Sequence, residues 1–210
     1  ICNGDCRKVI SELKKLQTLC GDRMLPVLWI IPSMLIDDSL ELFVESGLVW
    51  KCIKIHPQLN PEIWVKSSTE MQTVISLASA MQLPLLIHTG ESDGCYPLQY
   101  SDVVEHNPHV TFILAHGRPI DETIQLMTQN QNVWVDTAFM PIEHVRTLCN
   151  EGLADRVLWG TDYPIPRYFY PNKNMIDYYL GLIEQLKTHV SNEDFKNITQ
   201  MNFNRLFSSH

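Results

Sequence analysis

The chain has 210 residues, of which 45% are hydrophobic and 19% charged, a composition typical of one globular domain spanning residues 1–210. The formal net charge of −8 and the pI near 5.4 argue against nucleic acid or an anionic membrane surface as a partner. No apolar run reaches the roughly 20 residues of a bilayer span, and the first residues do not show the pattern expected of a signal peptide. Together with six dispersed cysteines that form no C-x-x-C pair, these features predict a cytoplasmic protein with reduced thiols.

The spacing of apolar residues changes along the chain in a way that predicts alternating helices and strands. Helical spacing and capping residues predict helices at residues 5–19, 37–45, 68–81, 96–105, 119–128, 141–149, 174–188 and 192–207. Short apolar runs predict strands at residues 24–31, 48–55, 84–87, 110–115, 132–135 and 157–160. This regular alternation predicts an α/β fold in which helices cover a parallel sheet.

Two architectures fit this pattern, an open sheet and a (β/α)8 TIM barrel. Polar residues mark the carboxyl ends of successive predicted strands: Lys54, His56, His88, His116, Asp136 and Asp162. A barrel directs all of its strand ends toward one mouth, whereas an open sheet spreads them along an edge. No glycine-rich dinucleotide fingerprint follows any of the strands. We therefore favour the barrel.

Three of these strand-end residues have side chains suited to binding a metal. His88, His116 and Asp162 supply two imidazoles and a carboxylate, which are ligand types of catalytic zinc sites. Zinc brings the pKa of a bound water to about 7, and a neighbouring carboxylate or histidine can then accept the proton. The alternative is that each residue only ends its strand by hydrogen bonding. The matching positions of all three favour the metal site.

Four short segments resemble strand-end motifs of the amidohydrolase superfamily: Ile87–Gly90, Leu114–Gly117, Asn132–Thr137 and Gly160–Pro164. They are most similar to the amidohydrolase-related branch (amidohydrolase 2), which also holds the carboxymuconate-semialdehyde-type decarboxylases. Two further segments, Ile53–Pro57 and Asn202–Phe207, resemble the fourth-strand motif and the closing helix of that branch. The resemblance spans residues 48–207, most of the chain.

The resemblance implies a divalent metal, most often zinc, at the mouth of the barrel. It makes His88 the fifth-strand ligand, and Asp162 the eighth-strand carboxylate that binds metal and shuttles the proton. His116 becomes the sixth-strand histidine, either a second ligand or a base beside the metal. Three roles are possible for Lys54: a carboxylated lysine that bridges two metals, a cation that binds a substrate carboxylate, or a buried structural lysine. The bridging role is disfavoured because this branch usually holds a single metal.

Other residues near these motifs are candidates for contact with a substrate. We interpret His56 and Arg118 as substrate-binding residues, the alternatives being a loop histidine and a solvated surface arginine. We interpret Asp136 as a partner of the site rather than a ligand. Aromatic residues that follow Asp162 are expected to wall the pocket or to pack their own loop: Tyr163, Tyr168, Phe169 and Tyr170.

The sequence departs from the family at one motif. The first strand of the family carries a His-x-His pair that completes the metal site, and no His-x-His occurs in this chain. The predicted strands correspond to strands three to eight of the barrel. We therefore expect the first two βα units, roughly 50 residues at the usual unit size, to be absent from this chain.

These observations favour a metal-dependent hydrolase that uses metal-activated water on a small substrate bearing a carboxylate. One alternative is a non-oxidative, metal-dependent decarboxylase on the same fold. Another is a catalytically inactive scaffold or interaction protein, which would bind no metal. The predicted partner is a small molecule, and the sequence allows assembly into a homo-oligomer.

Overall fold

The computed structural model describes residues 6–36, 39–60, 63–64, 68–90 and 92–207. Its centre is a sheet of six strands that pair in the order of the chain. The strands are β1 Val27–Trp29, β2 Cys52–Ile55, β3 Leu85–His88, β4 Phe112–Ala115, β5 Val133–Asp136 and β6 Val157–Leu158. Every neighbouring pair is parallel, so each connection must cross over one face of the sheet.

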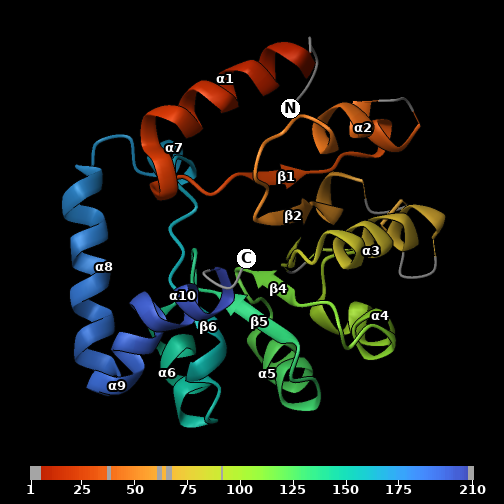
Figure 1. The fold of residues 1–210 in the computed structure, drawn as a ribbon. Coiled ribbons are helices and arrows are strands. Elements are labelled where there is room, and N and C mark those ends of the chain that lie inside the picture. The colour runs from red at the N-terminus through yellow and green to blue at the C-terminus, as the bar shows by residue number, and fades with distance from the viewer. Residues whose placement is uncertain (1–5, 37–38, 61–62, 65–67, 91, 208–210) are drawn as a thin grey trace.

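Helices surround this sheet (Figure 1). They are α1 Cys6–Cys20, α2 Ser39–Val44, α3 Thr69–Met81, α4 Ser101–His106, α5 Ile120–Gln129, α6 Ile142–Asn150, α7 Ile165–Phe169, α8 Met175–His189, α9 Asn192–Lys196 and α10 Asn202–Phe207. A π-helical turn, Asn197–Met201, joins α9 to α10. None of the helices within the described ranges is long and apolar enough to cross a membrane.

The predicted strands are all present, but several are shorter than predicted. β1 begins at Val27, directly after Pro26, whose fixed φ and missing N–H disfavour a place inside a sheet. β6 ends at Leu158 because the N–H of Trp159 donates to the carbonyl of Ile198 at 3.0 Å instead of continuing the ladder. Residues 5 and 37–38, at the predicted starts of two helices, lie outside the described residues.

The short helix α7 has no counterpart among the predicted helices. It follows the tip of β6, and the N–H of Ile165 donates to the carbonyl of Asp162 at 2.8 Å. Pro166 lies in its first turn, where the missing N–H costs nothing. α7 therefore places a turn of helix directly against the end of the last strand.

Alternating side chains of the strands face two different hydrophobic clusters. The larger cluster packs against the helices and includes fully buried strand residues: Ile53, Ile55, Leu85, Ile87, Phe112, Leu114, Val133, Val135 and Val157. The smaller cluster lies on the opposite face and consists of Cys52, Ile113, Trp134 and Leu158, with Leu86, Leu206 and Phe207 packed against it. The opposite face is therefore an inner face, packed at one level by two side chains of α10.

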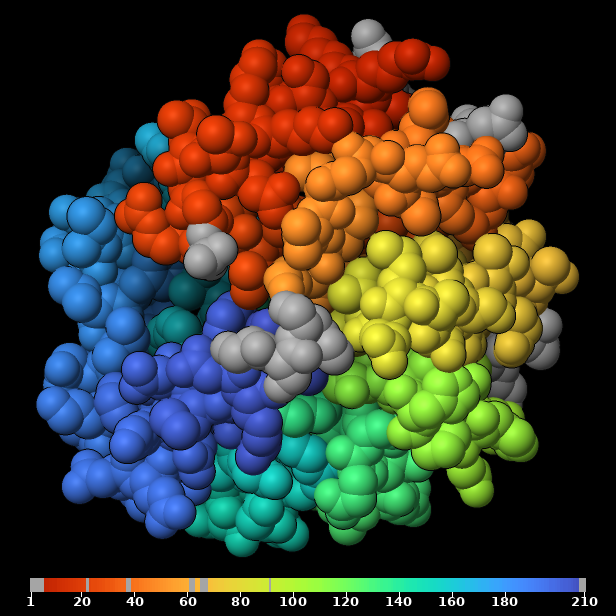
Figure 2. Space-filling model, viewed as in Figure 1, coloured from red at the N-terminus to blue at the C-terminus, as the bar shows by residue number. Residues whose placement is uncertain are grey.

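The sheet is open, since β1 and β6 are its two edges in the described part of the chain. Figure 2 shows the molecular surface hollowed between the red N-terminal and the blue C-terminal segments, with teal atoms visible at depth. The six-stranded sheet is thus curved and covered on its outer face, and its two edges are not joined to each other among the described residues.

Arg156 joins the start of β6 to the chain before β5. Its side chain is buried, and Nη1 lies 2.9, 2.8 and 3.1 Å from the carbonyl oxygens of Met127, Asn130 and Val133. Nη1 of a guanidinium carries two N–H donors, so the three carbonyl oxygens share them, with one N–H divided between two acceptors. These contacts fix the turn between α5 and β5 and the first residue of β5, at the end of the strand opposite the site.

We expect Arg156→Met to lower the free energy of unfolding by about 3 kcal/mol, because it leaves buried carbonyls without a donor. Urea unfolding followed by circular dichroism measures this loss. Arg146→Met is the matched control, since Arg146 is exposed and contacts only Glu143 among the ion pairs described. Its loss should stay below about 1 kcal/mol, as for other surface pairs. Equal losses in the two variants would contradict the structural role of Arg156.

Candidate active site

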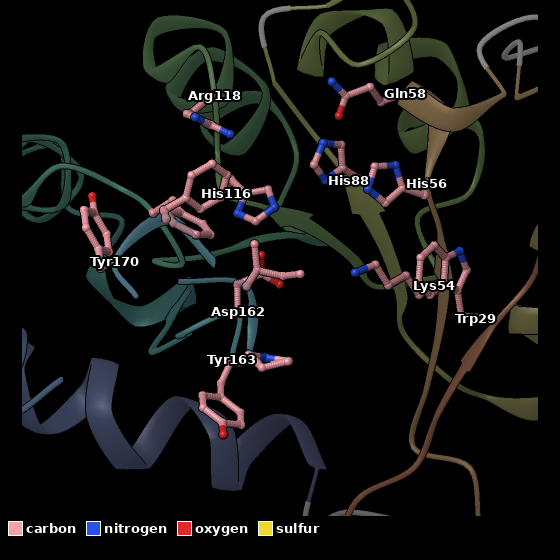
Figure 3. A pocket seen from close by; sticks show the side chains of 14 residues that line it. Trp29, Lys54, His56, Gln58, His88, His116, Arg118, Asp162, Tyr163 and Tyr170 are labelled. Atoms are coloured by element: carbon pink, nitrogen blue, oxygen red, sulfur yellow. The ribbon is translucent and has the colours of Figure 1, made fainter. Parts of the chain in front are cut away.

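A cavity of about 770 Å³ lies at the carboxyl ends of the strands. All of the predicted site residues line it: Lys54, His56, His88, His116, Arg118 and Asp162. In Figure 3, His56 and His88 lie on one wall, and His116 and Asp162 lie on the facing wall. The structure therefore brings the predicted residues together at one site, although they are up to 108 residues apart in the chain (162 − 54).

The alternation of side chains places the polar residues of β2, β3 and β5 on the inner face. Lys54 follows Cys52 by two positions, and His88 and Asp136 follow Leu86 and Trp134 in the same way. Residues two apart in a strand share a face. The apolar inner cluster therefore supports the polar layer directly above it, and the strand ends set the position of each functional group.

His116 breaks this alternation. Phe112 and Leu114 of β4 face the helices, so continued alternation would direct His116 away from the inner face. Instead its backbone adopts a φ of 71°, in the left-handed region, and its ring lines the cavity. Its Nδ1 lies 3.0 Å from the carbonyl oxygen of Ala138. Because a carbonyl only accepts, Nδ1 carries the proton, and Nε2 is left with a free lone pair.

The three histidines form a contiguous cluster. The ring centroids of His56 and His88 are 3.8 Å apart in a stacked arrangement, and those of His88 and His116 are 4.9 Å apart in an edge-on arrangement. Burial, reinforced by the charge of Lys54, lowers the pKa of His56 to about 4. Burial and the neighbouring His56 lower the pKa of His88 to about 3. Both rings are therefore neutral at pH 7, the state in which an imidazole can bind a metal.

Asp162 lies at the tip of the β6 segment, between β6 and α7. Its φ is 49°, an uncommon backbone conformation for a residue other than glycine. Two residues earlier, Gly160 allows the β6 segment to approach β5, because a Cβ there would lie 3.1 Å from Oδ1 of Asp136. In Figure 3 the Asp162 side chain lies below His116, on the same side of the cavity. The close packing of the strand ends thus places a carboxylate beside an imidazole.

Two cations face the cavity, Lys54 and Arg118. The Lys54 ammonium lies 5.1 Å from the centre of the Trp29 ring, and in Figure 3 it extends toward the middle of the site. Neither cation takes part in an ion pair found within the described residues. Nε of Arg118 is buried and has no hydrogen-bond partner there. An acidic protein therefore presents unpaired positive charge in this cavity, which suits an anionic ligand.

Aromatic side chains complete the walls, and some of them were not predicted. Tyr163, Phe169 and Tyr170 are partly exposed and line the cavity as the sequence suggested, whereas Tyr168 is not among the lining residues. The unpredicted members include Trp29, which stacks on His56, and Phe139, whose ring centre lies 6.0 Å from that of His116. Trp29 ends β1, so its strand-end position was the available signal. Phe139 gave no signal, because it lies in a loop.

The donor atoms fit a divalent metal in their chemistry. His88 offers a neutral imidazole, His116 offers Nε2 of its ring, and Asp162 offers a carboxylate on the same cavity, which are ligand types that zinc accepts. As placed, however, no three histidine, cysteine, aspartate or glutamate side chains of the described residues form a group able to hold a metal. The ligand chemistry is therefore present, although these side chains are not gathered into a metal-binding group.

The parallel sheet, its surrounding helices and the histidine–carboxylate cavity at the strand ends define a TIM-barrel-like α/β protein. A model of the family described as amidohydrolase (Amidohydro_2) matches residues 33–199. The chain therefore belongs to the amidohydrolase 2 family of the amidohydrolase superfamily. A comparison with curated proteins gives no significant match.

Solved structures support the fold assignment. An uncharacterised TIM-barrel protein from Bordetella bronchiseptica is similar at a TM-score of 0.72 and 18% identity, with 95% of this chain and 72% of that chain covered. An amidohydrolase from Burkholderia multivorans with bound zinc has a TM-score of 0.66 and 10% identity, covering 96% and 79%. A probable 2-pyrone-4,6-dicarboxylic acid hydrolase from Acinetobacter baumannii with bound citric acid has a TM-score of 0.57 and 8% identity, covering 97% and 88%. Likeness at these identities shows the fold alone.

Proposed function

We propose that this protein is a metal-dependent hydrolase that acts on a small anionic substrate. One observation carries the proposal: His88, His116, Asp162 and two unpaired cations line a single cavity at the strand ends. Membership of the amidohydrolase family and the zinc bound by the Burkholderia amidohydrolase support a metal role for these residues. We further propose that β1–β6 correspond to the third to eighth strands of a (β/α)8 barrel, with the cavity at its mouth.

In this proposal His88, His116 and Asp162 hold the metal. A divalent ion, with zinc the first candidate, supplies a Lewis acid for the substrate carbonyl and lowers the pKa of water. Asp162 accepts the proton as water attacks, and returns it to the leaving group. His116 would bind the metal through Nε2, because its Nδ1 is engaged by the Ala138 carbonyl.

Lys54 and Arg118 bind the negative charge of the substrate in this proposal, with His56 beside them. The citric acid bound to the Acinetobacter hydrolase supports citrate as a probe of this role. We expect Arg118→Gln and Lys54→Met each to weaken citrate binding at least about tenfold, through loss of a charge-assisted contact. Isothermal titration calorimetry measures the change. Lys187→Met, at an exposed lysine of α8, is the control and should bind citrate as the wild type does.

Hydrolysis is tested by screening carboxylated lactones and amides in water enriched in ¹⁸O. The proposal predicts that one ¹⁸O atom enters the product and that no carbon dioxide forms. Decarboxylation is the second candidate, favoured by the Lys54 ammonium extending toward the middle of the site, where it could orient a substrate carboxylate. That carboxylate would leave as carbon dioxide, and the substrate carbon would take a proton in its place. Release of carbon dioxide without ¹⁸O incorporation would establish that alternative. A protein that binds no metal and turns over no substrate would be the inactive scaffold.

A further inference from the structure

Asp136 ends β5 and is absent from the residues that line the cavity. Its Oδ1 accepts hydrogen bonds from the N–H of His116 at 3.1 Å and from the N–H of Ala138 at 2.9 Å. Burial raises the pKa of the Asp136 carboxyl, whereas the neighbouring His116 lowers it. In either protonation state Oδ1 can accept both hydrogen bonds. Asp136 therefore acts on the site through its neighbours rather than by touching a substrate.

Hydrogen bonds link Asp136, Ala138 and His116 in a closed set. The N–H of Ala138 binds Asp136, and the carbonyl of Ala138 lies 3.0 Å from Nδ1 of His116. The N–H of His116 returns to the same carboxylate oxygen. We call this closed set of three hydrogen bonds the Asp136 hydrogen-bond network. It fixes the His116 backbone and one nitrogen of its imidazole relative to the same point in the fold.

The left-handed backbone of His116 makes this support necessary. A φ of 71° is unfavourable for a residue with a side chain, so it persists where surrounding contacts hold it. The next residue is packed tightly, since a Cβ on Gly117 would clash with Cγ2 of Val135. A Cβ on Gly160 would lie 3.1 Å from Oδ1 of Asp136. The ends of β4, β5 and β6 thus converge around this one carboxylate.

We propose that Asp136 is a positioning residue, which holds the Ala138 carbonyl against Nδ1 of His116 and so keeps Nε2 unprotonated at the cavity. Fixing one imidazole tautomer through a hydrogen bond to the other nitrogen is how proteins prepare a histidine for metal binding or proton transfer. The role of Nε2 in the reaction rests on the proposed function. The tautomer itself does not, so the two can be tested separately.

Long-range ¹H–¹⁵N spectra of the metal-free protein, labelled with ¹⁵N-histidine, report the tautomer of each ring. The His116 signals are assigned by their loss in His116→Gln. We expect wild-type His116 to carry its proton on Nδ1 alone. Asp136→Asn should keep this signature, because its amide oxygen accepts the same two hydrogen bonds. Asp136→Ala should give a mixture of both tautomers, and its zinc affinity should fall roughly 10–100-fold, as for loss of an outer-shell partner.

Asp177→Ala, at an exposed aspartate of α8, is the control and should leave the His116 signals unchanged. Circular dichroism establishes that each variant is folded. If Asp136→Ala does not fold, the wild-type and Asp136→Asn spectra decide the matter, because an Nε2–H tautomer in either one overturns the inference. Wild-type signals in folded Asp136→Ala overturn it as well. If the wild type binds no zinc but its tautomer depends on Asp136, the proposed function fails and this inference stands.

Discussion

Asp162→Asn is expected to lower turnover by roughly 10²–10⁴-fold, the usual contribution of a positioned general acid–base, while the fold remains intact. The amide keeps the size of the side chain at the tip of the β6 segment, but it cannot accept a proton at neutral pH. The change should be carried by kcat, because proton transfer belongs to the reaction step rather than to binding. Steady-state kinetics on a substrate found in the lactone and amide screen measures it.

The matched control for this substitution is Asp177→Asn, which makes the same chemical change on the exposed face of α8. It should leave kcat unchanged. Circular dichroism and the urea midpoint of Asp162→Asn should stay close to the wild type, since its left-handed φ suits asparagine as well as aspartate. Full turnover in folded Asp162→Asn would remove this residue from the proposed chemistry.

The second large effect concerns the histidines. His88→Ala and His116→Ala should each lower zinc affinity by more than the roughly 100-fold that loss of an outer-shell partner costs, because each removes a direct ligand. Competition with a chromophoric chelator measures the affinity. Removing zinc from the wild type by dialysis against a chelator should abolish hydrolysis, and adding zinc back should restore it.

His109→Ala is the control for a general loss of histidine, since His109 is exposed in the turn before β4. It should bind zinc as the wild type does. Unchanged zinc affinity in both His88→Ala and His116→Ala would show that the metal, if bound, is held elsewhere. Hydrolysis that survives complete removal of metal would instead favour a metal-independent reaction by Asp162 and His116.

Much of the fold followed from periodicity in the sequence. Runs such as Leu85–Ile87 are bounded by proline on one side and by a polar residue on the other, so the sequence predicts both the strand and its carboxyl end. The same strand-end positions predicted that Lys54, His88 and Asp162 lie close together, and in the structure they line one cavity. Strand lengths were less well predicted, because pairing depends on distant partners. The N–H of Trp159 leaves the sheet ladder and donates a hydrogen bond to Ile198, 39 residues later (198 − 159). The residues around β6 do not predict this distant partner.

Details of the site depended on backbone geometry that residue types do not encode. Alternation of side chains along β4 would direct His116 away from the inner face. Its left-handed φ and the Asp136 hydrogen-bond network bring its imidazole into the cavity. Phe139 also has a positive φ, of 56°, which a phenylalanine does not suggest. The stacking of Trp29 on His56 depends on the register of β1 against β2, which the sequence leaves unspecified.

The proposed metal site is tested by an anomalous difference map, measured at the zinc absorption edge from crystals of the protein grown with zinc. We expect one strong peak in the cavity. It should lie about 2.0–2.2 Å from an imidazole nitrogen of His88, from Nε2 of His116 and from a carboxylate oxygen of Asp162. A map without a peak in this cavity, or with a peak bound only by other residues, would contradict it.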